Sequence, residues 1–435
     1  MLAAMPPIPP PLPDRGEPPV RDRGDACPGA LRLHAADDGL LARLRLPAGV
    51  LTSRQAHVLA DAAETLGDGR ISVTSRGNVE LRGLSEGCDA RLAELLSAAA
   101  LLPSSAHERI RNIVASPLAG VDGIGGGNVQ LWARELDGLL CGQDWTTALS
   151  GRFLFALDDG RGDVAGLGAD VTLFSTSRAD GDALVRAGAR TVRVAGSDAA
   201  RAALAAAGAF LAAARAAGTG AWRVRELPAG VEPDLAGALV RAGVPARPAA
   251  PHTPTTPPGS AGPRPGVLGD PATGRYAVSV VARLGRLTAA QLRALTPDGA
   301  APGELRLTPW RGAVVTGFPG RPAAEARLGA LAGAGLLTRA DSPWLDVGAC
   351  TGRPGCAKSL ADVRADATPG TDGGGSPVRF SGCERRCGHP TGGPGEWVDV
   401  VATADGHYLV DGRPVPRTDL PDAVAAARRP STPTR

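Results

Sequence analysis

Four cysteines in the C-terminal part of the sequence are the residues best suited to chemistry. They stand as two close pairs: Cys350 and Cys356 have a C-x5-C spacing, and Cys383 and Cys387 have a C-x3-C spacing. Such thiolates hold zinc, hold an iron–sulfur cluster or form a redox switch. Structural zinc sites prefer about two to four residues between paired ligands. The wider first pair therefore favours a 4Fe–4S cluster over zinc, and zinc over switch thiols.

The residues around these cysteines suit a negatively charged cluster. Glycine lets backbone N–H groups approach sulfur closely, and five glycines lie in or beside the two pairs: Gly348, Gly352, Gly355, Gly382 and Gly388. We expect a helix to begin at about Ala357 or Lys358, with its positive N-terminal end toward the cluster. The other cysteines, Cys27, Cys88 and Cys141, are isolated and are interpreted as inert thiols.

The composition limits the class of protein. With 435 residues the chain is long enough for about two to four domains. Aromatic residues make up only 3%, so the core must consist of Ala, Leu and Val. A net charge of +3 is too small to indicate a nucleic-acid surface. The Pro-rich N-terminus lacks the apolar core of a signal peptide, and no apolar run reaches the roughly 18 residues of a membrane span. We therefore expect a cytoplasmic protein, in which close-set cysteines bind metal more often than they form disulfides.

A proline-rich stretch at residues 246–266 divides the chain into two halves. Both halves place Leu-Thr before an Ala- and Leu-rich helix, follow it with a strand, and then have an Arg-Gly turn, at residues 74–77 and 308–312. This order indicates a duplicated domain. A later hairpin turning at residues 404–406 is matched to a hairpin expected to begin at Arg152.

The expected domains follow from this division. They are a disordered tail (1–26), a first half-domain (27–100), a first α/β domain without a cluster (101–245), a linker (246–266), a second half-domain (267–340) and a cluster-binding α/β domain (341–425).

Three further motifs complete the pattern. They are "VTSRGNVELRG", "RIRNIVASP" and "LSGRFLFALDDG", which contain Arg76, Arg111 and Arg152 in that order. Together with the cysteine spacing, they resemble the nitrite/sulfite reductase family over residues 27–415. The resemblance implies an α+β fold with two ferredoxin-like half-domains and two α/β cluster-type domains. It also implies that the four cysteines hold a 4Fe–4S cluster and that Cys387 can bridge to a sirohaem iron.

Within that family the sequence looks most like the precorrin-3B synthase branch, through "ACPGALR", "DDGLLARLRLPAGVLTSRQ" and "LTPWRG". That branch uses O2 to hydroxylate precorrin-3A at C20 in aerobic cobalamin biosynthesis, and it implies a second, non-haem iron. The family usually has two lysines in a K-F-K strand, but this chain has Arg152 and Leu154 at those positions. Losing one proton-delivering cation argues against sulfite reduction.

The resemblance also implies which residues bind the tetrapyrrole. Arg76, Arg111 and Arg152 match family positions that contact tetrapyrrole or anion, and arginine pairs well with carboxylate arms. Arg82 and Arg311 are candidates near the repeated turns, for which a solvated surface role is equally favoured. For the second iron, His107 and His389 are the best-placed histidines, but a hydrogen-bonding or surface role is favoured for both and no ligand is assigned.

We expect electrons from an external ferredoxin or a reductase that uses NAD(P)H. Two other functions stay open. One is a sirohaem-dependent nitrite or sulfite reductase, and the other is a non-catalytic zinc-binding or tetrapyrrole-carrier protein.

Overall fold

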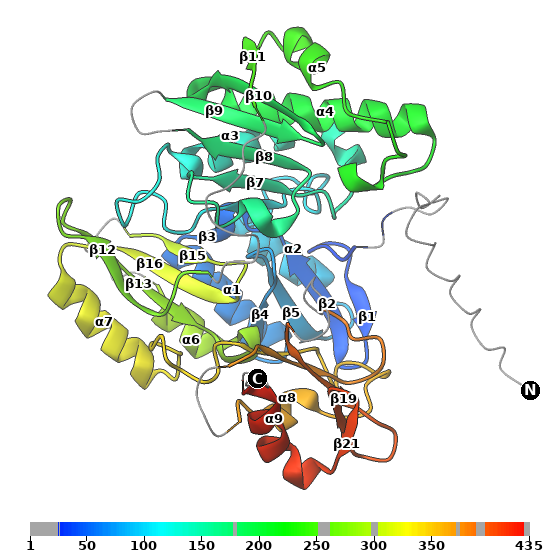
Figure 1. Cartoon of the computed structure of the whole chain (residues 1–435), viewed down its shortest axis with the longest axis vertical. Helices are drawn as coiled ribbons and strands as arrows, with labels where there is room; N and C mark the ends of the chain where they lie inside the picture. Colours follow the sequence, from blue (N-terminus) through cyan, green and yellow to red (C-terminus); the bar gives the residue numbers. More distant parts are fainter. Residues whose placement is uncertain are drawn as a thin grey trace, which may run out of the picture.

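The chain is arranged in three parts along its long axis (Figure 1). This computed structural model describes residues 25, 27–176, 181–250, 262–296, 303–370, 375–388 and 396–429. An α/β unit lies at one end, two interlocked sheets lie in the middle, and a smaller α/β unit lies at the other end. The expected disordered tail falls outside the described residues except for Asp25, as do residues 251–261 of the expected linker.

The central part contains two five-stranded sheets of matching design. The first has the order β1 (His34–Ala36), β2 (Gly39–Leu44), β5 (Val79–Leu84), β4 (Arg70–Val73) and β14 (Arg286–Thr288). The second has the order β12 (Gly266–Asp270), β13 (Arg275–Val281), β16 (Gly312–Phe318), β15 (Leu305–Leu307) and β3 (Val50–Leu51). Each sheet therefore takes its last strand from the other half of the chain.

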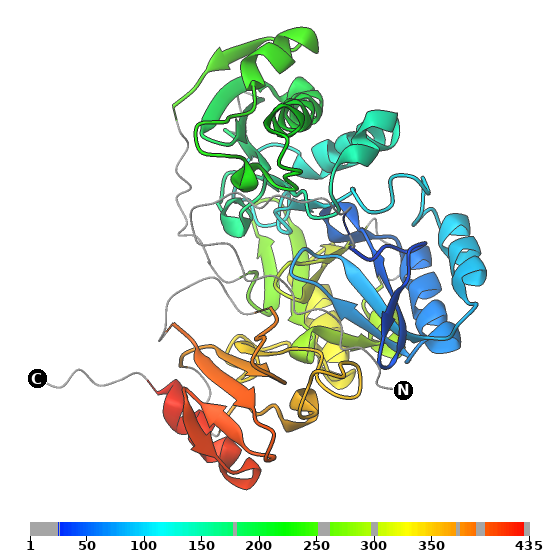
Figure 2. The ribbon, with the colours of Figure 1, turned by 90° about the vertical axis from the view of Figure 1, so that its right-hand side faces the viewer.

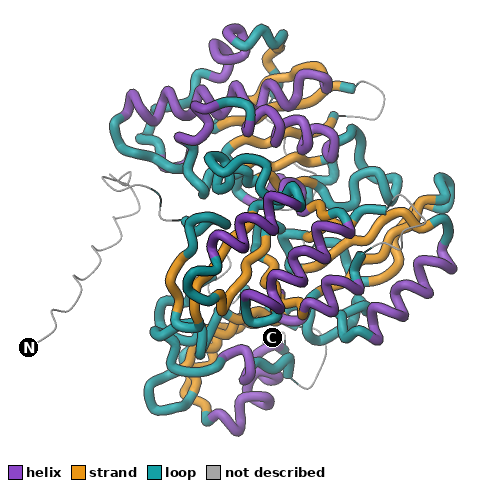
Figure 3. The backbone as a smooth tube through the Cα atoms, turned by 180° about the vertical axis from the view of Figure 1, so that it is seen from behind, coloured by secondary structure: helices purple, strands orange, loops and turns teal. Residues whose placement is uncertain are grey.

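The exchanged strands lock the two halves together. Arg286 of β14 lies opposite Ser72 of β4, and Leu51 of β3 lies opposite Leu305 of β15. Four helices cover one side of these sheets (Figure 3): α1 (Ser53–Leu66), α2 (Asp89–Ala98), α6 (Ala289–Ala294) and α7 (Arg321–Gly333). Residues of both sheets and all four helices share one hydrophobic core, so neither half buries its apolar surface alone.

The duplication extends to single residues. Thr52 and Gln55 form a capping box at the start of α1, and Thr288 and Gln291 form the same box at the start of α6. Just before each exchanged strand, a non-glycine residue has left-handed backbone geometry: the φ angle is 55° at Ala48 and 53° at Leu284. Such conformations are costly for residues with a Cβ, so their recurrence supports a common origin.

The structure corrects the expected match between the two Arg-Gly turns. The backbone N–H of Thr74 donates to the carbonyl oxygen of Asn78, and that of Thr308 donates to the carbonyl oxygen of Gly312. Trp310 therefore occupies the position of Arg76, and Arg311 occupies that of Gly77. Gly77 and Arg311 also share positive φ angles, 67° and 63°. The match by sequence pairs Arg76 with Arg311 and is one residue out of register, because it rests on shared residue types and not on the hydrogen bonds of the turns.

The first α/β unit has one six-stranded sheet. Its order is β11 (Ala246–Pro248), β10 (Arg190–Ala195), β9 (Asp182–Ala187), β8 (Val171–Ser175), β7 (Phe155–Asp158) and β6 (Ile113–Ala115). The helices of this unit are α3 (Val129–Cys141), α4 (Ala199–Ala217) and α5 (Leu235–Arg241). Strand β11 lies within the expected linker, where proline is tolerated because the strand is at the sheet edge.

Helix α4 qualifies the expectation that the chain has no possible membrane span. Together with the turn before it, the helix spans Gly196–Ala217 and is long and apolar enough to cross a membrane. Half of its most apolar 18-residue stretch is buried inside the protein, however. Its alanines pack with Phe210 into the core of the first α/β unit. This is the behaviour of an ordinary core helix.

The C-terminal unit repeats the strand pattern of the first. Its sheet has the order β17 (Val347–Ala349), β18 (Val378–Ser381), β19 (Val398–Ala402), β20 (Tyr408–Val410) and β21 (Arg413–Val415), with helices α8 (Val363–Asp366) and α9 (Leu420–Arg428). In both units the first three strands are parallel and the next two are antiparallel. Figure 2 shows this unit against the central part, from the side.

Two local expectations for this region were wrong. The hairpin turning at residues 404–406 exists as β19 and β20, but its counterpart is β8 and β9, because β7 pairs with β8 in parallel. No helix begins at Ala357. That segment is a turn in which the Ala357 N–H donates to Oδ2 of Asp37, and α8 begins only at Val363, capped by Asp362.

Candidate functional site

Cys350 and Cys383 lie at the same edge of the C-terminal sheet. Cys350 directly follows β17, and Cys383 comes two residues after its parallel neighbour β18. The backbone N–H of Gly382 donates to Sγ of Cys350 at 3.2 Å. An N–H group directed at sulfur stabilises a thiolate, so one of the glycines expected to approach the cysteines does so.

The other two cysteines, Cys356 and Cys387, lie in loops whose backbone oxygens accept hydrogen bonds from arginine side chains. Nη2 of Arg82 donates to the carbonyl oxygen of Gly355 at 2.8 Å, next to Cys356. Nη2 of Arg379 donates to the carbonyl oxygen of Cys387 at 3.1 Å. The first half-domain and strand β18 thus fix the two loops.

Three arginines beside these thiols have no carboxylate partner among the described residues: Arg311, Arg364 and Arg379. A methyl group on Gly348 would lie 2.7 Å from Nη1 of Arg379 and 3.4 Å from Nη1 of Arg311. Nε of Arg364 donates to the carbonyl oxygen of Cys350 at 2.9 Å. Nε of Arg379 is buried and has no hydrogen-bond partner. The guanidiniums of these three arginines therefore lie close to Cys350 or to the nearby Gly348.

The electrostatics of this group indicate a missing negative charge. Burial, followed by the neighbouring guanidiniums, lowers the pKa of Arg364 and of Arg379 to about 10. Burial also lowers the pKa of Arg311. The thiols act in the opposite direction, because Cys350 and Cys387 favour the charged form of Arg379. Buried cations without counter-charges are unfavourable, so the site is suited to an anionic group.

The donor set fits an iron–sulfur cluster better than a single zinc ion. No three of the four thiols lie within 4.8 Å of one another; the one such group of potential ligands among the described residues is Asp158, Asp159 and Asp163. A tetrahedral zinc site needs its ligands close around one ion, whereas a cluster spreads its thiolates over several irons.

Two of the sequence-predicted arginines, Arg76 and Arg152, contact each other. Arg76 donates through Nη2 to the carbonyl oxygen of Arg152 at 3.0 Å. The guanidinium of Arg152 lies 4.9 Å from the ring centroid of Trp222. Burial, then the nearby charge of Arg223, lowers the pKa of Arg76 to about 10. Neither Arg76 nor Arg152 has a carboxylate partner in the described chain.

Arg111 and Arg82 are already neutralised. Nε of Arg111 lies 2.6 Å from Oδ1 of Asp137 in a buried ion pair. Burial alone would lower its pKa, but Asp137 outweighs burial and raises it. Arg82 forms a two-pronged ion pair with Asp38, at 3.0 and 2.9 Å. Either arginine would have to leave its aspartate to bind a substrate carboxylate.

Sequence reasoning missed Arg364, Arg379 and Arg45. Arg379 stands in an apolar strand four residues before Cys383, which is a readable signal for a buried cation near a ligand. Arg45 is only 3% exposed, and its Nε and Nη1 have no hydrogen-bond partner. Of the histidines considered for a second iron, His107 bonds to Ser104 and to a backbone carbonyl oxygen through its two ring nitrogens, and His389 lies outside the described residues.

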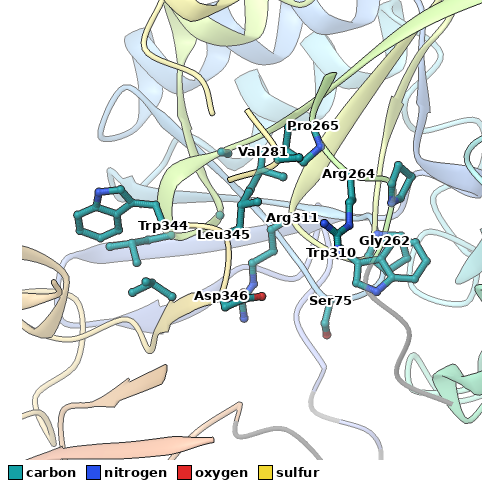
Figure 4. Close-up of a pocket in the computed structure, with 17 residues that line it drawn as sticks. Ser75, Gly262, Arg264, Pro265, Val281, Trp310, Arg311, Trp344, Leu345 and Asp346 are labelled. Carbon is teal, nitrogen blue, oxygen red and sulfur yellow. The ribbon is translucent and has the colours of Figure 1, made fainter. Parts of the chain in front are cut away.

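A cavity of about 550 Å³ opens between the second half-domain and the C-terminal unit (Figure 4). Its lining includes Trp310, Trp344, Arg264 and Arg311, and it reaches Ser75, the neighbour of Arg76. Aromatic faces with a few cations suit a flat, negatively charged ligand.

Comparison with known proteins agrees with this architecture. Residues 34–99 match the family model of the nitrite/sulfite reductase ferredoxin-like half domain. A precorrin-3B synthase from Sinorhizobium sp is 39% identical over 100 residues, which are 23% of this chain and 21% of that protein. A ferredoxin–nitrite reductase from Synechococcus elongatus is 40% identical over 84 residues, 19% of this chain and 16% of that protein. These matches thus span about a fifth of the relatives.

The fold match is much broader. The structure of the NirA protein from Mycobacterium tuberculosis superposes with a TM-score of 0.65, covering 91% of this chain and 82% of that chain at 17% sequence identity. The chain therefore carries a nitrite/sulfite reductase ferredoxin-like half domain within the α+β fold of nitrite/sulfite reductases, as the resemblance implied.

Proposed function

We propose that the chain is an iron–sulfur mono-oxygenase of the precorrin-3B synthase type. In this proposal it hydroxylates precorrin-3A at C20 with O2 and forms the γ-lactone of precorrin-3B. One oxygen atom enters the macrocycle, and the other is reduced to water with an electron pair and protons. The similarity to precorrin-3B synthase over 100 residues supports this choice.

The four cysteines, Cys350, Cys356, Cys383 and Cys387, would hold a 4Fe–4S cluster. When bound, such a cluster supplies single-electron transfer. The chain's own contribution is charge balance, because Arg379 and Arg364 lie beside the thiols without carboxylates. The N–H group of Gly382 adds a hydrogen bond to Cys350.

The observation that carries the proposal is the aromatic cavity beside the cysteine-bearing sheet. Its volume of about 550 Å³ lies within the usual range of small-molecule sites. Trp310 and Trp344 contribute aromatic surface to the cavity, although the Arg283 guanidinium lies 3.6 Å from the Trp344 ring centroid and covers one of its faces. Arg264 and Arg311 offer charge to the carboxylate arms of a macrocycle. Trp310 stands where the first half has Arg76, so the second turn provides an aromatic surface in place of a cation.

Leu154 favours oxygen insertion over oxyanion reduction. It is 3% exposed and packs with Val114, Ala156 and Val164. A buried leucine cannot deliver the protons that a multi-electron reduction consumes. The strand keeps one cation, Arg152, which lies near Arg76.

The proposal also includes a setting for the enzyme. Electrons would come from NAD(P)H through an external ferredoxin or reductase, and the protein would be cytoplasmic. A second, non-haem iron would serve O2 chemistry, without ligands assigned here. The second candidate is a sirohaem-dependent nitrite or sulfite reductase, which the similarity to ferredoxin–nitrite reductase supports.

Turnover of precorrin-3A under 18O2 by anaerobically purified protein tests the proposal. We expect one 18O atom in the new hydroxyl or lactone, together with iron and sulfide in the protein. A sirohaem absorption spectrum with nitrite or sulfite turnover would replace this function by the second candidate. Zinc in place of iron and sulfide would exclude both.

A further inference from the structure

A second cavity, of about 560 Å³, lies on the other side of Leu284 from the proposed substrate cavity. Leu284 lines both cavities. The walls come from three parts of the chain: the first half-domain, the segment around β14, and the loop that carries Cys350 and Cys356. The cavity is therefore built only when all three parts are assembled.

The charge lining this second cavity is strongly unbalanced. Six arginines line it: Arg70, Arg82, Arg283, Arg286, Arg353 and Arg364. Only three acidic residues do so: Asp38, Asp68 and Asp362. Asp38 is paired with Arg82 and Asp68 with Arg286, while Asp362 caps α8.

Four of these arginines have no carboxylate partner among the described residues: Arg70, Arg283, Arg353 and Arg364. Two of them contact the cysteine loop through backbone oxygens. Nε of Arg353 donates to the carbonyl oxygen of Ser359 at 2.8 Å, and Nε of Arg364 donates to that of Cys350 at 2.9 Å. These bonds hold the guanidiniums at the cavity wall but leave their charge uncompensated.

The corresponding position in the first half of the duplicated chain also has a cavity, and the two can be compared. A smaller cavity of about 230 Å³ is lined by Ala48, Gln55 and Ala100, where the second cavity has Leu284, Gln291 and Gly335. Three arginines, Arg45, Arg111 and Arg134, also line the smaller cavity, and its one aspartate, Asp137, pairs with Arg111. Both cavities are therefore lined by more arginines than acidic residues, and the excess is larger around the second cavity.

We propose that the cavity lined by these six arginines binds a free, multiply charged small oxyanion, such as an oligophosphate or a tricarboxylate. Several guanidiniums converging on one anion form strong, charge-assisted hydrogen bonds. Because the ligand would contact the loop carrying Cys350 and Cys356, its binding would also restrict that loop. This site does not depend on the proposed mono-oxygenase activity.

Isothermal titration calorimetry of the purified holoprotein with sodium tripolyphosphate tests this site. We expect one site per chain, with affinity that falls as salt is added. Arg70→Gln combined with Arg283→Gln should weaken binding about tenfold or more, since each removes a cation that has no other ionic partner. The matched control is Arg190→Gln with Arg413→Gln, which removes two exposed strand arginines outside the cavity. It should bind within about twofold of the wild type.

Hydrogen exchange of the bound protein locates the site independently. Tripolyphosphate should slow amide exchange in residues 351–365 and 286–291, and leave residues 129–141 unchanged. If the double variant does not fold, Arg70→Gln alone gives the comparison, because its side chain is exposed and makes no described hydrogen bond.

Three results would overturn the proposal: no binding at low salt, an equal loss in the control variant, or displacement of tripolyphosphate by a polycarboxylate porphyrin. The last result would make the cavity an extension of the substrate site.

Discussion

The two α/β units share a strand pattern but present opposite chemistry at the ends of corresponding strands. In the first unit, β6 is followed by Ser116, and β7 ends at Asp158 and is followed by Asp159. The Asp158 carboxylate accepts four backbone N–H groups, from Gly160, Gly162, Val164 and Ala165. Arg161 pairs with Asp159 and Asp122. The polar groups of this network bond to one another, and three of its four carboxylates, including Asp163, share the one guanidinium of Arg161.

In the C-terminal unit, thiols replace those acids and cations stay uncompensated. Cys350 and Cys383 follow β17 and β18, and Arg379 and Arg364 lie beside them without a carboxylate partner among the residues that the structure describes. The difference teaches that duplication preserved the scaffold while one copy became a closed structural network. The other copy has cations beside its thiols, which would suit the proposed iron–sulfur cluster.

Among the changes that test this difference between the two units, removing a thiol of the C-terminal unit should have the largest effect, on the iron and sulfide content. We expect Cys383→Ala to abolish the cluster, so that iron and acid-labile sulfide fall to near zero after anaerobic purification. Cys141→Ala, a cysteine of the first unit, serves as the control and should keep wild-type iron and sulfide. Full iron and sulfide in Cys383→Ala would refute the assignment of this residue as a ligand.

Removing a buried cation should have opposite consequences in the two units. In the first unit Arg223 pairs with Asp170 at 2.5 Å, with both side chains buried. Arg223→Met would leave that carboxylate unpaired and lower the free energy of unfolding by about 3–5 kcal/mol, with or without a cluster. Arg379→Met should stabilise the cluster-free chain by about 2 kcal/mol, because it removes an uncompensated charge.

With the cluster loaded, Arg379→Met should instead destabilise the protein. Urea unfolding of the loaded and cluster-free forms measures both signs. If Arg379→Met changes the free energy of unfolding in the same direction in both forms, Arg379 does not balance the charge of the cluster.

The smallest effect concerns the closed network. Burial, opposed by a hydrogen bond from Ser116, raises the pKa of Asp163 from its ordinary 3.8 to about 7. Between these values the folded chain binds more protons than the unfolded chain, so this group's contribution falls as pH rises toward 7. Asp163→Asn should remove this decrease in the free energy of unfolding, because asparagine does not titrate. Its stability relative to the wild type should increase by about 1–2 kcal/mol from about pH 5 to about pH 8. Urea unfolding at both pH values measures it, and an unchanged difference would contradict the shift.

Much of the fold could be predicted from the sequence because the signals were local or repeated. The Leu-Thr motif correctly predicted that a helix follows Leu51 and Leu287, and the structure adds a capping box at Thr52 and at Thr288. Cys350 and Cys383 follow neighbouring parallel strands, while the common cluster of the four cysteines stays a prediction. The family motifs singled out Arg76 and Arg152, which contact each other in the structure; their role in binding a tetrapyrrole stays a prediction.

The remaining features depend on contacts that sequence spacing does not encode. Arg311 takes the place of Gly77 only through turn hydrogen bonds, so letters alone gave the wrong alignment. The neutralisation of Arg111 needs Asp137 from a separate helix. The charge beside Cys350 comes from Arg364 and Arg379, which are near it only after β17 and β18 pair.

The exchange of β3 and β14 has a consequence for synthesis on the ribosome. The first sheet is completed by Arg286–Thr288, so it cannot close until the second half has begun to emerge. Until then the edge of β4 stays open. We expect the first half produced alone to expose this edge and aggregate. The two halves are thus a single cooperative folding unit, although each resembles a separate module in sequence.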